Sequence, residues 1–264
     1  MSQKGQSVAS IEELLKGKGI GKPKIELRSD RRAFDEMREV QITRGYCKHA
    51  LGSCLIEVGD TRVMCAANME NRVPPHIKNT GMGWITAEYG MLPASTSVRT
   101  TRESTRGRPM GRTQEIQRLI GRCLRATAAL EYLGERTIWV DCDVLQADGG
   151  TRTASITGAY VALMDAVNSL LEQQIITRNP ITDQVAAISV GMVDGELLLD
   201  LTYEEDSRAD VDMNVVMATG SSIIEIQGTA EKAPFSFQQM MTMIHLAKKG
   251  IDQLMERQLQ TLAE

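Results

Sequence analysis

The chain has 264 residues, a formal net charge of −4 and 42% hydrophobic residues, a balance typical of globular proteins. This length allows one large domain or two small ones. No apolar run approaches the length of a membrane span, and the polar segment from Met1 to Lys24 lacks the apolar core of a secretory signal. The five scattered cysteines include no Cys-x-x-Cys pair, which argues against a disulfide framework or a structural zinc site. We therefore expect a cytoplasmic protein with reduced thiols.

Residues 1–26 are expected to be a polar N-terminal extension, because this Lys- and Gly-rich segment has too few apolar side chains to join a core. The rest of the chain, residues 27–264, is expected to form a single domain. In its first half, apolar alternation and turn residues predict strands at residues 40–43, 53–58, 62–67 and 84–89. A polar loop from Pro93 to Met110 then precedes a helix predicted at residues 113–132, where apolar side chains recur at helical spacing.

The second half of the chain continues with both kinds of element. A strand at residues 137–140 leads through a Gly149-Gly150 turn into a helix predicted at residues 154–174. Four more strands and a closing helix are predicted at residues 185–193, 196–202, 211–217, 222–227 and 237–262. Groups of strands with helices between them indicate the α+β class, with helices stacked on one face of a mixed sheet.

The turn at Gly149 and Gly150 is a candidate phosphate site. A glycine turn lets backbone amides approach a ligand closely, and the first turn of a helix presents unpaired N–H groups. The hydroxyl of Thr151 and the guanidinium of Arg152 follow at once, and guanidinium pairs with phosphate in a two-pronged fit. An ordinary glycine turn before a capped helix would produce the same string, so this interpretation depends on the rest of the chain.

A basic segment precedes this turn in the sequence. Between residues 99 and 125 there are eight arginines and two glutamates, a local net charge of +6. The segment contains no lysine, and arginine favours bidentate contacts with phosphate groups such as those of a nucleic acid. A solvated helix face with some ion pairs explains the last three equally well, because these lie in the predicted helix: Arg118, Arg122 and Arg125.

An acidic segment lies further on, where one predicted strand ends and another begins across an intervening loop. It holds six carboxylates: Asp200, Glu204, Glu205, Asp206, Asp210 and Asp212. Close carboxylates provide the hard oxygen ligands that Mg²⁺ takes together with water and substrate phosphates. An exposed acidic turn is the alternative. Taken with the phosphate site and the arginines, however, the acids indicate phosphoryl transfer on a nucleic acid, because a pure binding module would not need them.

Several long motifs resemble ribonuclease PH. They are VQITRGY at residues 40–46, KHALGS at 48–53, GWITAEYGMLP at 83–93, GRTQEIQRLIGR at 111–122, DCDVLQADGGTRTASITG at 141–158, DMNVVM at 212–217 and QGTAE at 227–231. The resemblance covers residues 27–264 without large gaps, and leaves residues 1–26 without a counterpart. It implies the two-layer fold of ribosomal protein S5 domain 2, also seen in exosome and polynucleotide phosphorylase subunits.

The resemblance also implies an activity. It is that of a phosphate-dependent 3′→5′ exoribonuclease, a tRNA nucleotidyltransferase that trims precursor tRNA, with structured RNA such as rRNA as a further substrate. Inorganic phosphate would be the co-substrate, Mg²⁺ or Mn²⁺ the metal, and six copies would assemble into a ring, a trimer of dimers. A catalytically silent RNA-binding ring subunit is the alternative function. A nucleotide-binding domain of P-loop type is disfavoured, because the Gly-Lys-Ser/Thr ending is missing.

The resemblance assigns roles to particular residues. The family's phosphate-binding arginine falls on Arg112, and its phosphate loop falls on Gly150, Thr151 and Arg152. Its catalytic, metal-binding aspartates fall on Asp206 and Asp212. Of three arginines in its RNA-binding loop, two match Arg99 and Arg102, whereas the third position holds Ala94.

The remaining candidates fall outside this assignment. Arg106 lies in the same loop as Arg99 and Arg102 and is expected to contact RNA with them. His49 and His245 are expected to be structural, because phosphorolysis already has its groups without them. Trp84 and Tyr89 could stack on a base, but their strand spacing favours a place in the core or at an interface.

Overall fold

The computed structural model describes residues 28–107 and 110–264. The chain divides into two compact units, residues 1–33 and 34–264, and the fold below is that of the second unit. In the first unit, the Arg32 guanidinium donates to the Asp30 carboxylate over 2.6 Å within a short turn. The predicted extension at residues 1–26 lies outside the described residues.

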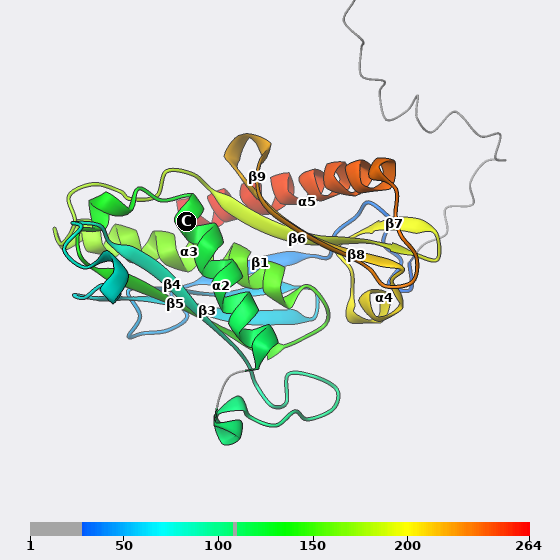
Figure 1. The fold of residues 1–264 in the computed structure, drawn as a ribbon, viewed down its shortest axis with the longest axis horizontal. Coiled ribbons are helices and arrows are strands. Elements are labelled where there is room, and N and C mark those ends of the chain that lie inside the picture. Colours follow the sequence, from blue (N-terminus) through cyan, green and yellow to red (C-terminus); the bar gives the residue numbers. More distant parts are fainter. Residues whose placement is uncertain (1–27, 108–109) are drawn as a thin grey trace, which may run out of the picture. The chain divides into compact units, whose positions relative to one another are not determined.

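The first sheet of this unit is mixed, as the strand pattern predicted (Figure 1). Across the described sheet the strands lie in the order β1 (Val40–Arg44), β2 (Gly52–Val58), β3 (Thr61–Glu70), β5 (Thr137–Gln146) and β4 (Trp84–Met91). β4 runs parallel to β5, whereas the other neighbours are antiparallel. The β2–β3 hairpin closes with Val58 opposite Thr61.

The later strands form a second, antiparallel sheet of their own, whereas the sequence analysis expected one sheet. Within the described residues its order is β7 (Glu196–Leu199), β6 (Val185–Val193), β8 (Val211–Ala218) and β9 (Ser222–Ala230). β7 ends at Leu199 rather than at residue 202, because Asp200 adopts a left-handed φ of 55°. The chain turns there toward α4 (Tyr203–Arg208).

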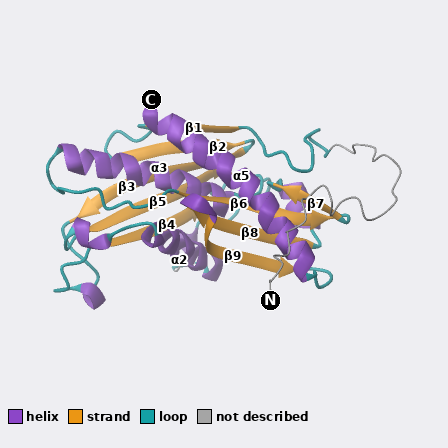
Figure 2. Cartoon of the chain, turned by 90° about the horizontal axis from the view of Figure 1, so that it is seen from above, coloured by secondary structure: helices purple, strands orange, loops and turns teal. Residues whose placement is uncertain are grey.

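α3 (Thr151–Glu172) packs against both sheets, on β2 and β3 of the first and on β6 of the second. Figure 2 shows α2 (Gly111–Ala126) beside β4, and α5 (Phe237–Ala263) along the second sheet. Among the described residues, α3 is the one helix long and apolar enough for a membrane span, a run that the sequence analysis did not expect. In that apolar window 72% of the residues are buried, because both sheets cover most of the helix, and its less buried positions include the polar residues Asp165 and Asn168.

α2 is shorter than the predicted helix at residues 113–132. It ends at Ala126 because the next residues pair with another segment: Ala129 N–H donates to the Pro180 carbonyl at 2.7 Å, and Thr182 N–H donates to the Thr127 carbonyl at 2.9 Å. Such long-range pairing leaves no signal in local periodicity. The described residues also include 3₁₀ turns at Pro75–Ile77, Glu103–Arg106, Leu130–Leu133 and Thr219–Ser221.

Candidate active site

The glycine turn after β5 is built as the sequence predicts. Gly149 and Gly150 have φ values of 78° and 66°, in the left-handed region that favours glycine. A Cβ on Gly149 would lie 2.4 Å from the Leu201 carbonyl oxygen, so no side chain fits there. α3 begins at Thr151 rather than at residue 154, which places Thr151 and Arg152 in the helix's first turn. The predicted phosphate-binding residues of this loop therefore surround one helix N-terminus.

Tyr89 of β4 contacts the end of this loop at Thr151. Its ring is buried, as expected for a core position, and its hydroxyl lies 2.9 Å from Thr151 Oγ1. Burial raises the pKa of Tyr89, and the charges of Arg112 and Arg152 oppose that rise. The sequence analysis missed this contact, because the strand that carries Tyr89 gives no sign of what its hydroxyl meets.

Arg112 and Arg152 occupy equivalent places, each the second residue of a helix. Both act electrostatically on Asp206 as well as on Tyr89, so the structure brings the two predicted phosphate-binding arginines to one site with a predicted catalytic acid. Arg152 Nη1 donates to Gln227 Oε1 at 3.1 Å, which fixes one edge of its guanidinium and leaves further donors for a ligand.

A polar chain continues from Gln227 to α2. Gln227 Nε2 donates to Glu225 Oε1 at 3.0 Å, and Glu225 Oε2 pairs with Arg122 Nη1 at 2.5 Å. β9 thereby links the α3 arginine of the site to α2, which carries Arg112 at its start. The ion-pair alternative for the helical arginines is correct for Arg122.

Arg125 has a structural contact too. Its guanidinium stacks over the Trp84 ring at 4.2 Å, and Arg125 Nη1 donates to the Ile85 carbonyl at 2.7 Å. Trp84 is accordingly a packing residue of β4, and its ring face is occupied by Arg125 rather than open to a base.

The predicted loop between the two strands is wrong for Asp206, whereas the predicted strand at residues 211–217 is confirmed for Asp212. Asp206 belongs to α4, and Asp212 is the second residue of β8. Thr202 and Glu205 form a capping box that starts α4: Thr202 N–H donates to Glu205 Oε2 at 2.9 Å, and Glu205 N–H donates to Thr202 Oγ1 at 3.4 Å. The Thr-x-x-Glu spacing was the signal in the sequence that could have revealed this helix.

The two aspartates lie close enough to influence each other. Burial raises the pKa of Asp206, against the charges of Arg152 and Arg112. Burial also raises the pKa of Asp212, and the charges of Asp206 and Glu231 add to the effect. Glu231, one residue beyond β9, is thus a third acid at the site, which the sequence analysis quoted only as part of a motif.

This donor set fits a magnesium ion shared with a phosphate ligand. Asp212 Oδ1 is buried and has no hydrogen-bond partner among the described residues, as expected of an oxygen reserved for a cation. No described cluster of three or more acids, histidines or cysteines could hold a metal alone. Mg²⁺ typically needs only one or two carboxylates, because water and substrate phosphates supply its other ligands.

The arginine-bearing loop projects away from the first sheet next to the start of α2 (Figure 1). Arg99 and Arg102 are exposed there, whereas the side chain of Arg106 lies outside what the structure describes. Glu103 ties the loop to α2, accepting from Thr113 Oγ1 at 2.5 Å and from Met110 N–H at 3.4 Å. The exposed arginines thus stand on a loop anchored beside Arg112.

Two family descriptions match the chain. The 3′ exoribonuclease family, domain 1, matches residues 36–168, and domain 2 of the same family matches residues 183–250. The chain belongs to the 3′ exoribonuclease family. The predicted family and the predicted α+β fold class are confirmed, and so is the expectation of an enzyme of this family.

Individual proteins are similar to most of the chain, in sequence or in fold. Ribonuclease PH of Moorella thermoacetica is 57% identical over 238 residues, which cover 90% of this chain and 95% of that protein. A chain of the Archaeoglobus fulgidus exosome with RNA bound to the active site has a similar fold, with a TM-score of 0.75 and 22% identity. The matched region covers 88% of this chain and 92% of that chain. Rice (Oryza sativa) Rrp46 also has a similar fold, with a TM-score of 0.72 and 20% identity. That match covers 89% of this chain and 100% of the Rrp46 chain.

Proposed function

We propose that the chain is a phosphate-dependent 3′→5′ exoribonuclease that trims the 3′ ends of precursor tRNA, and of other structured RNA such as rRNA. The observation that carries this proposal is the convergence of Arg112 and Arg152 on Asp206 at the first turn of α3. Two guanidinium groups and free helix amides suit inorganic phosphate, and the acids suit the cation that accompanies it.

The chemistry is an exchange of phosphate esters. A phosphate oxygen forms a bond to the phosphorus of the last phosphodiester, and the bond from that phosphorus to the 3′ oxygen of the preceding nucleotide breaks. The 3′ oxygen takes a proton, for which one of the two aspartates is the donor, and a nucleoside diphosphate leaves. Bonds of similar energy are exchanged, so the reaction also runs as nucleotide addition.

The barrier comes mainly from bringing two anions together. Arg112 and Arg152 lower it by holding phosphate in place and by offsetting its charge, both preorganised on helix starts. Asp206 and Asp212 would hold Mg²⁺ or Mn²⁺, which supplies further positive charge to the phosphate oxygens when bound. A silent RNA-binding subunit would not need this combination of phosphate donors and paired acids.

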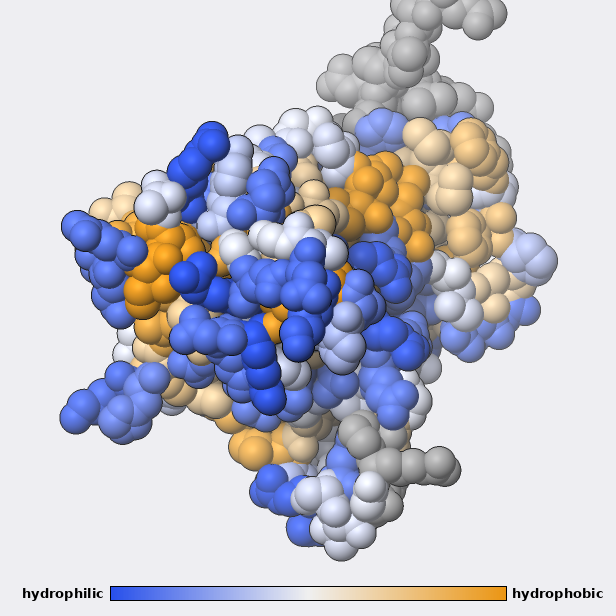
Figure 3. Space-filling model, turned by 60° about the vertical axis from the view of Figure 1, so that its left-hand side comes forward, coloured by the Kyte–Doolittle hydropathy of each residue, from blue (hydrophilic) through white to orange (hydrophobic). Residues whose placement is uncertain are grey.

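We also propose that six copies assemble into a ring in the cytoplasm, with RNA entering past the loop that carries Arg99, Arg102 and Arg106. Several large apolar side chains are exposed on the single chain, including Ile223 and Ile226 of β9 at 52% and 36%. Figure 3 shows apolar patches between strongly hydrophilic side chains on one face of the chain. Exposed apolar surface of this kind supports contacts between copies.

The test is incubation with an RNA that carries a 3′ tail, with Mg²⁺, in the presence and absence of inorganic phosphate. We expect shortening only with phosphate, and nucleoside diphosphates as the products identified by chromatography. Equal shortening without phosphate, with monophosphates as products, would indicate a hydrolase. RNA binding with no shortening under either condition would favour the silent ring subunit.

A further inference from the structure

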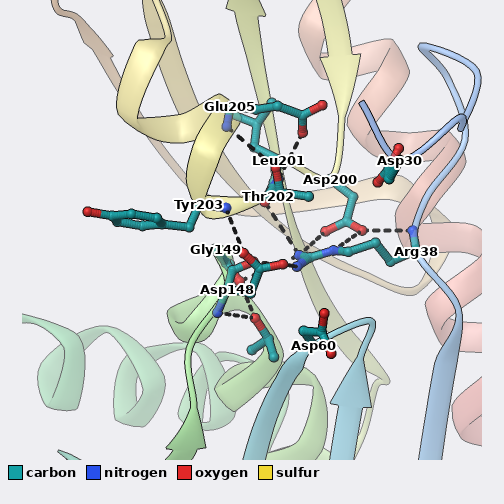
Figure 4. A network of polar contacts seen from close by, with 12 residues as sticks. Asp30, Arg38, Asp60, Asp148, Gly149, Asp200, Leu201, Thr202, Tyr203 and Glu205 are labelled. Atoms are coloured by element: carbon teal, nitrogen blue, oxygen red, sulfur yellow. Dashed lines mark hydrogen bonds and ion pairs between the residues drawn. The ribbon is translucent and has the colours of Figure 1, made fainter. Parts of the chain in front are cut away.

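A buried ion pair between Arg38 and Asp200 is the centre of a polar network beside the glycine turn (Figure 4). Arg38, two residues before β1, and Asp200, directly after β7, are 7% and 3% exposed. Arg38 Nε donates to Asp200 Oδ2 at 2.9 Å and Arg38 Nη2 to Asp200 Oδ1 at 2.7 Å, a two-pronged pairing. The backbone N–H of Arg38 donates to Asp200 Oδ2 as well, at 2.8 Å.

The same guanidinium reaches both segments that carry the site. Arg38 Nη1 donates to the Asp148 carbonyl at 2.5 Å, at the start of the glycine turn that leads to Arg152. Arg38 Nη2 lies 3.4 Å from the Leu201 carbonyl, on the segment that leads to Asp206. One side chain therefore joins the phosphate-binding turn to the approach of α4.

Further contacts fix the glycine turn on β3 and join it to the start of α4. Thr61 Oγ1 donates to the Gly149 carbonyl at 2.7 Å and accepts from Asp148 N–H at 2.9 Å. Tyr203 N–H, at the start of α4, lies 3.3 Å from Asp148 Oδ1. The distance between Arg152 and Asp206 is thus set through a network centred on Arg38, not by direct contact of the two segments alone.

The backbone conformation and the buried charge of Asp200 both cost free energy of folding, which its contacts must offset. Its φ of 55° lies in the left-handed region, which aspartate adopts more readily than most residues other than glycine, and its buried charge needs a partner. Arg38 is the partner that meets both carboxylate oxygens. A pair that served only to fill the core could be apolar, and replacement of such pairs by apolar residues is often neutral or stabilising.

We propose that Arg38 and Asp200 are positioning residues, which hold the phosphate-binding turn and α4 at the separation that phosphorolysis needs. They touch neither phosphate nor RNA, and they act through the carbonyls of Asp148 and Leu201 and the turn at residue 200. This inference rests on the proposed function, because the separation matters only if phosphate and the Asp206 carboxylate act on the same phosphodiester.

The test compares Arg38→Lys with Arg44→Lys. Lysine keeps the charge but loses the planar fork. Arg44 on β1 is the control. It makes a similar but more exposed fork with Asp165 at 2.7 Å and also donates to a carbonyl, that of Thr261 at 3.2 Å, but both partners lie away from the site. All variants are assayed well below their Tm, so that the folded fraction is the same.

For Arg38→Lys we expect kcat to fall at least about tenfold, since a displacement of about 1 Å near reacting groups can cost a hundredfold. We also expect a several-fold weaker Kd for inorganic phosphate by calorimetry, with unchanged affinity for RNA. Arg44→Lys should lose stability but keep both constants. If Arg38→Lys lowers Tm yet keeps kcat and the phosphate Kd within a factor of two of wild type, the pair only stabilises the fold and the inference is overturned.

Asp200→Asn provides a second variant in case Arg38→Lys does not fold. Asparagine tolerates a φ of 55° but lacks the charge, so the backbone turn persists while the clamp on Arg38 weakens. It should show the same fall in kcat and phosphate affinity, and wild-type values for both would overturn the inference. A wild-type protein that binds phosphate but releases no diphosphate contradicts the proposed function instead, and the phosphate Kd values of the variants then decide the question of positioning.

Discussion

The two aspartates of the site are placed where ionisation is unfavourable. Burial raises the pKa of Asp206 and of Asp212 above the usual 3.8. When the folded-state pKa of a carboxyl exceeds the unfolded value, the folded protein binds the proton more tightly, so ionisation costs stability as the pH rises above about 4. The arrangement therefore lowers stability at neutral pH, a cost that a functional site can carry.

Asp206→Asn and Asp212→Asn should each abolish turnover and yet raise thermal stability at neutral pH. The amide removes the cost of a partly desolvated charge, and solvent makes this gain smaller at the exposed Asp206 than at the half-buried Asp212. The expected gain is about 2–4 °C in Tm for each kcal/mol relieved. The measurement is Tm against pH in buffer with EDTA. The gain should be full above the raised pKa of each carboxyl, and it should disappear near pH 4, where the wild-type carboxyls are protonated.

Mg²⁺ and a neighbouring acid provide the controls. Added Mg²⁺ should raise the Tm of the wild type more than that of either Asn variant, because the metal binds the folded state through these carboxylates. Glu204→Gln removes an equal charge from another exposed residue of α4, one outside the candidate site, and should keep both turnover and the Mg²⁺ response. If the Asn variants stay active and keep the Mg²⁺ response, the acids of this segment have no role in catalysis or metal binding and are only solvated surface residues.

The sequence predicted the charged residues of the site better than their supports. Asp212, Arg112 and Arg152 stood in motifs and Asp206 stood in the acidic segment, and the structure brings the two arginines to Asp206. Their supporting contacts join residues far apart in the chain, such as Tyr89 with Thr151 at a separation of 62 residues and Arg152 with Gln227 at 75. Nothing in local spacing indicates such a contact, because it depends on where each strand lies relative to the start of α3.

At the scale of elements, the start of α3 depends on how closely two backbones approach. Gly149 lies against Leu201, and its φ of 78° is also unfavourable for other residues. Gly195, in the β6–β7 turn, has a similar φ of 85° but no heavy atom within 4 Å of an added Cβ. A comparison of the two glycines therefore distinguishes the effect of backbone strain, which both share, from that of steric contact, which only Gly149 has.

Gly149→Ala should destabilise the protein more than Gly195→Ala. Both substitutions place alanine in the left-handed region, which costs about 1–2 kcal/mol of stability. Only Gly149→Ala also makes the new Cβ overlap the Leu201 backbone, which costs about 1–3 kcal/mol more. Urea unfolding measures the difference, and calorimetry should show weaker phosphate binding for Gly149→Ala alone. Equal losses of stability and equal phosphate affinity would mean that the turn yields and that the close approach has no role.

Element boundaries show the same limit of local information. The strands and the two long helices after Gly150 were predicted from periodicity, but α2 ends early where residues 127–129 pair with residues 180–182. α4 was hidden in the acidic segment, although its Thr202–Glu205 capping box was readable. Local signals thus indicated where elements exist, whereas tertiary hydrogen bonds set where they end.

At the scale of the whole molecule, the sequence predicted the α+β class but not the division into two sheets. Most of the surface of α3 is apolar, and that is the sequence feature which requires cover from two sheets. In the proposed ring, the arginine loops of all subunits would gather at one opening, so their effect belongs to the assembly rather than to one chain.

Changing Arg99 and Arg102 together to Ala should weaken binding of a precursor tRNA and flatten its salt dependence. Each lost phosphate contact lowers the slope of log K against log salt by about 1, because fewer counterions are released. Turnover of a very short oligonucleotide should change much less, because that substrate barely extends beyond Arg112 and Arg152. The measurement is affinity for both RNAs across a series of salt concentrations.

A matched control distinguishes local contacts from net charge. Arg72→Ala combined with Lys248→Ala removes the same charge from two exposed ion pairs, those with Glu70 and Asp252, outside the arginine loop. If diffuse attraction by the whole ring governs binding, the two double variants should lose affinity and salt slope equally. If the loop contacts phosphates directly, only the Arg99 and Arg102 variant should lose slope. An unchanged affinity and slope in that variant would assign the loop to assembly or folding instead.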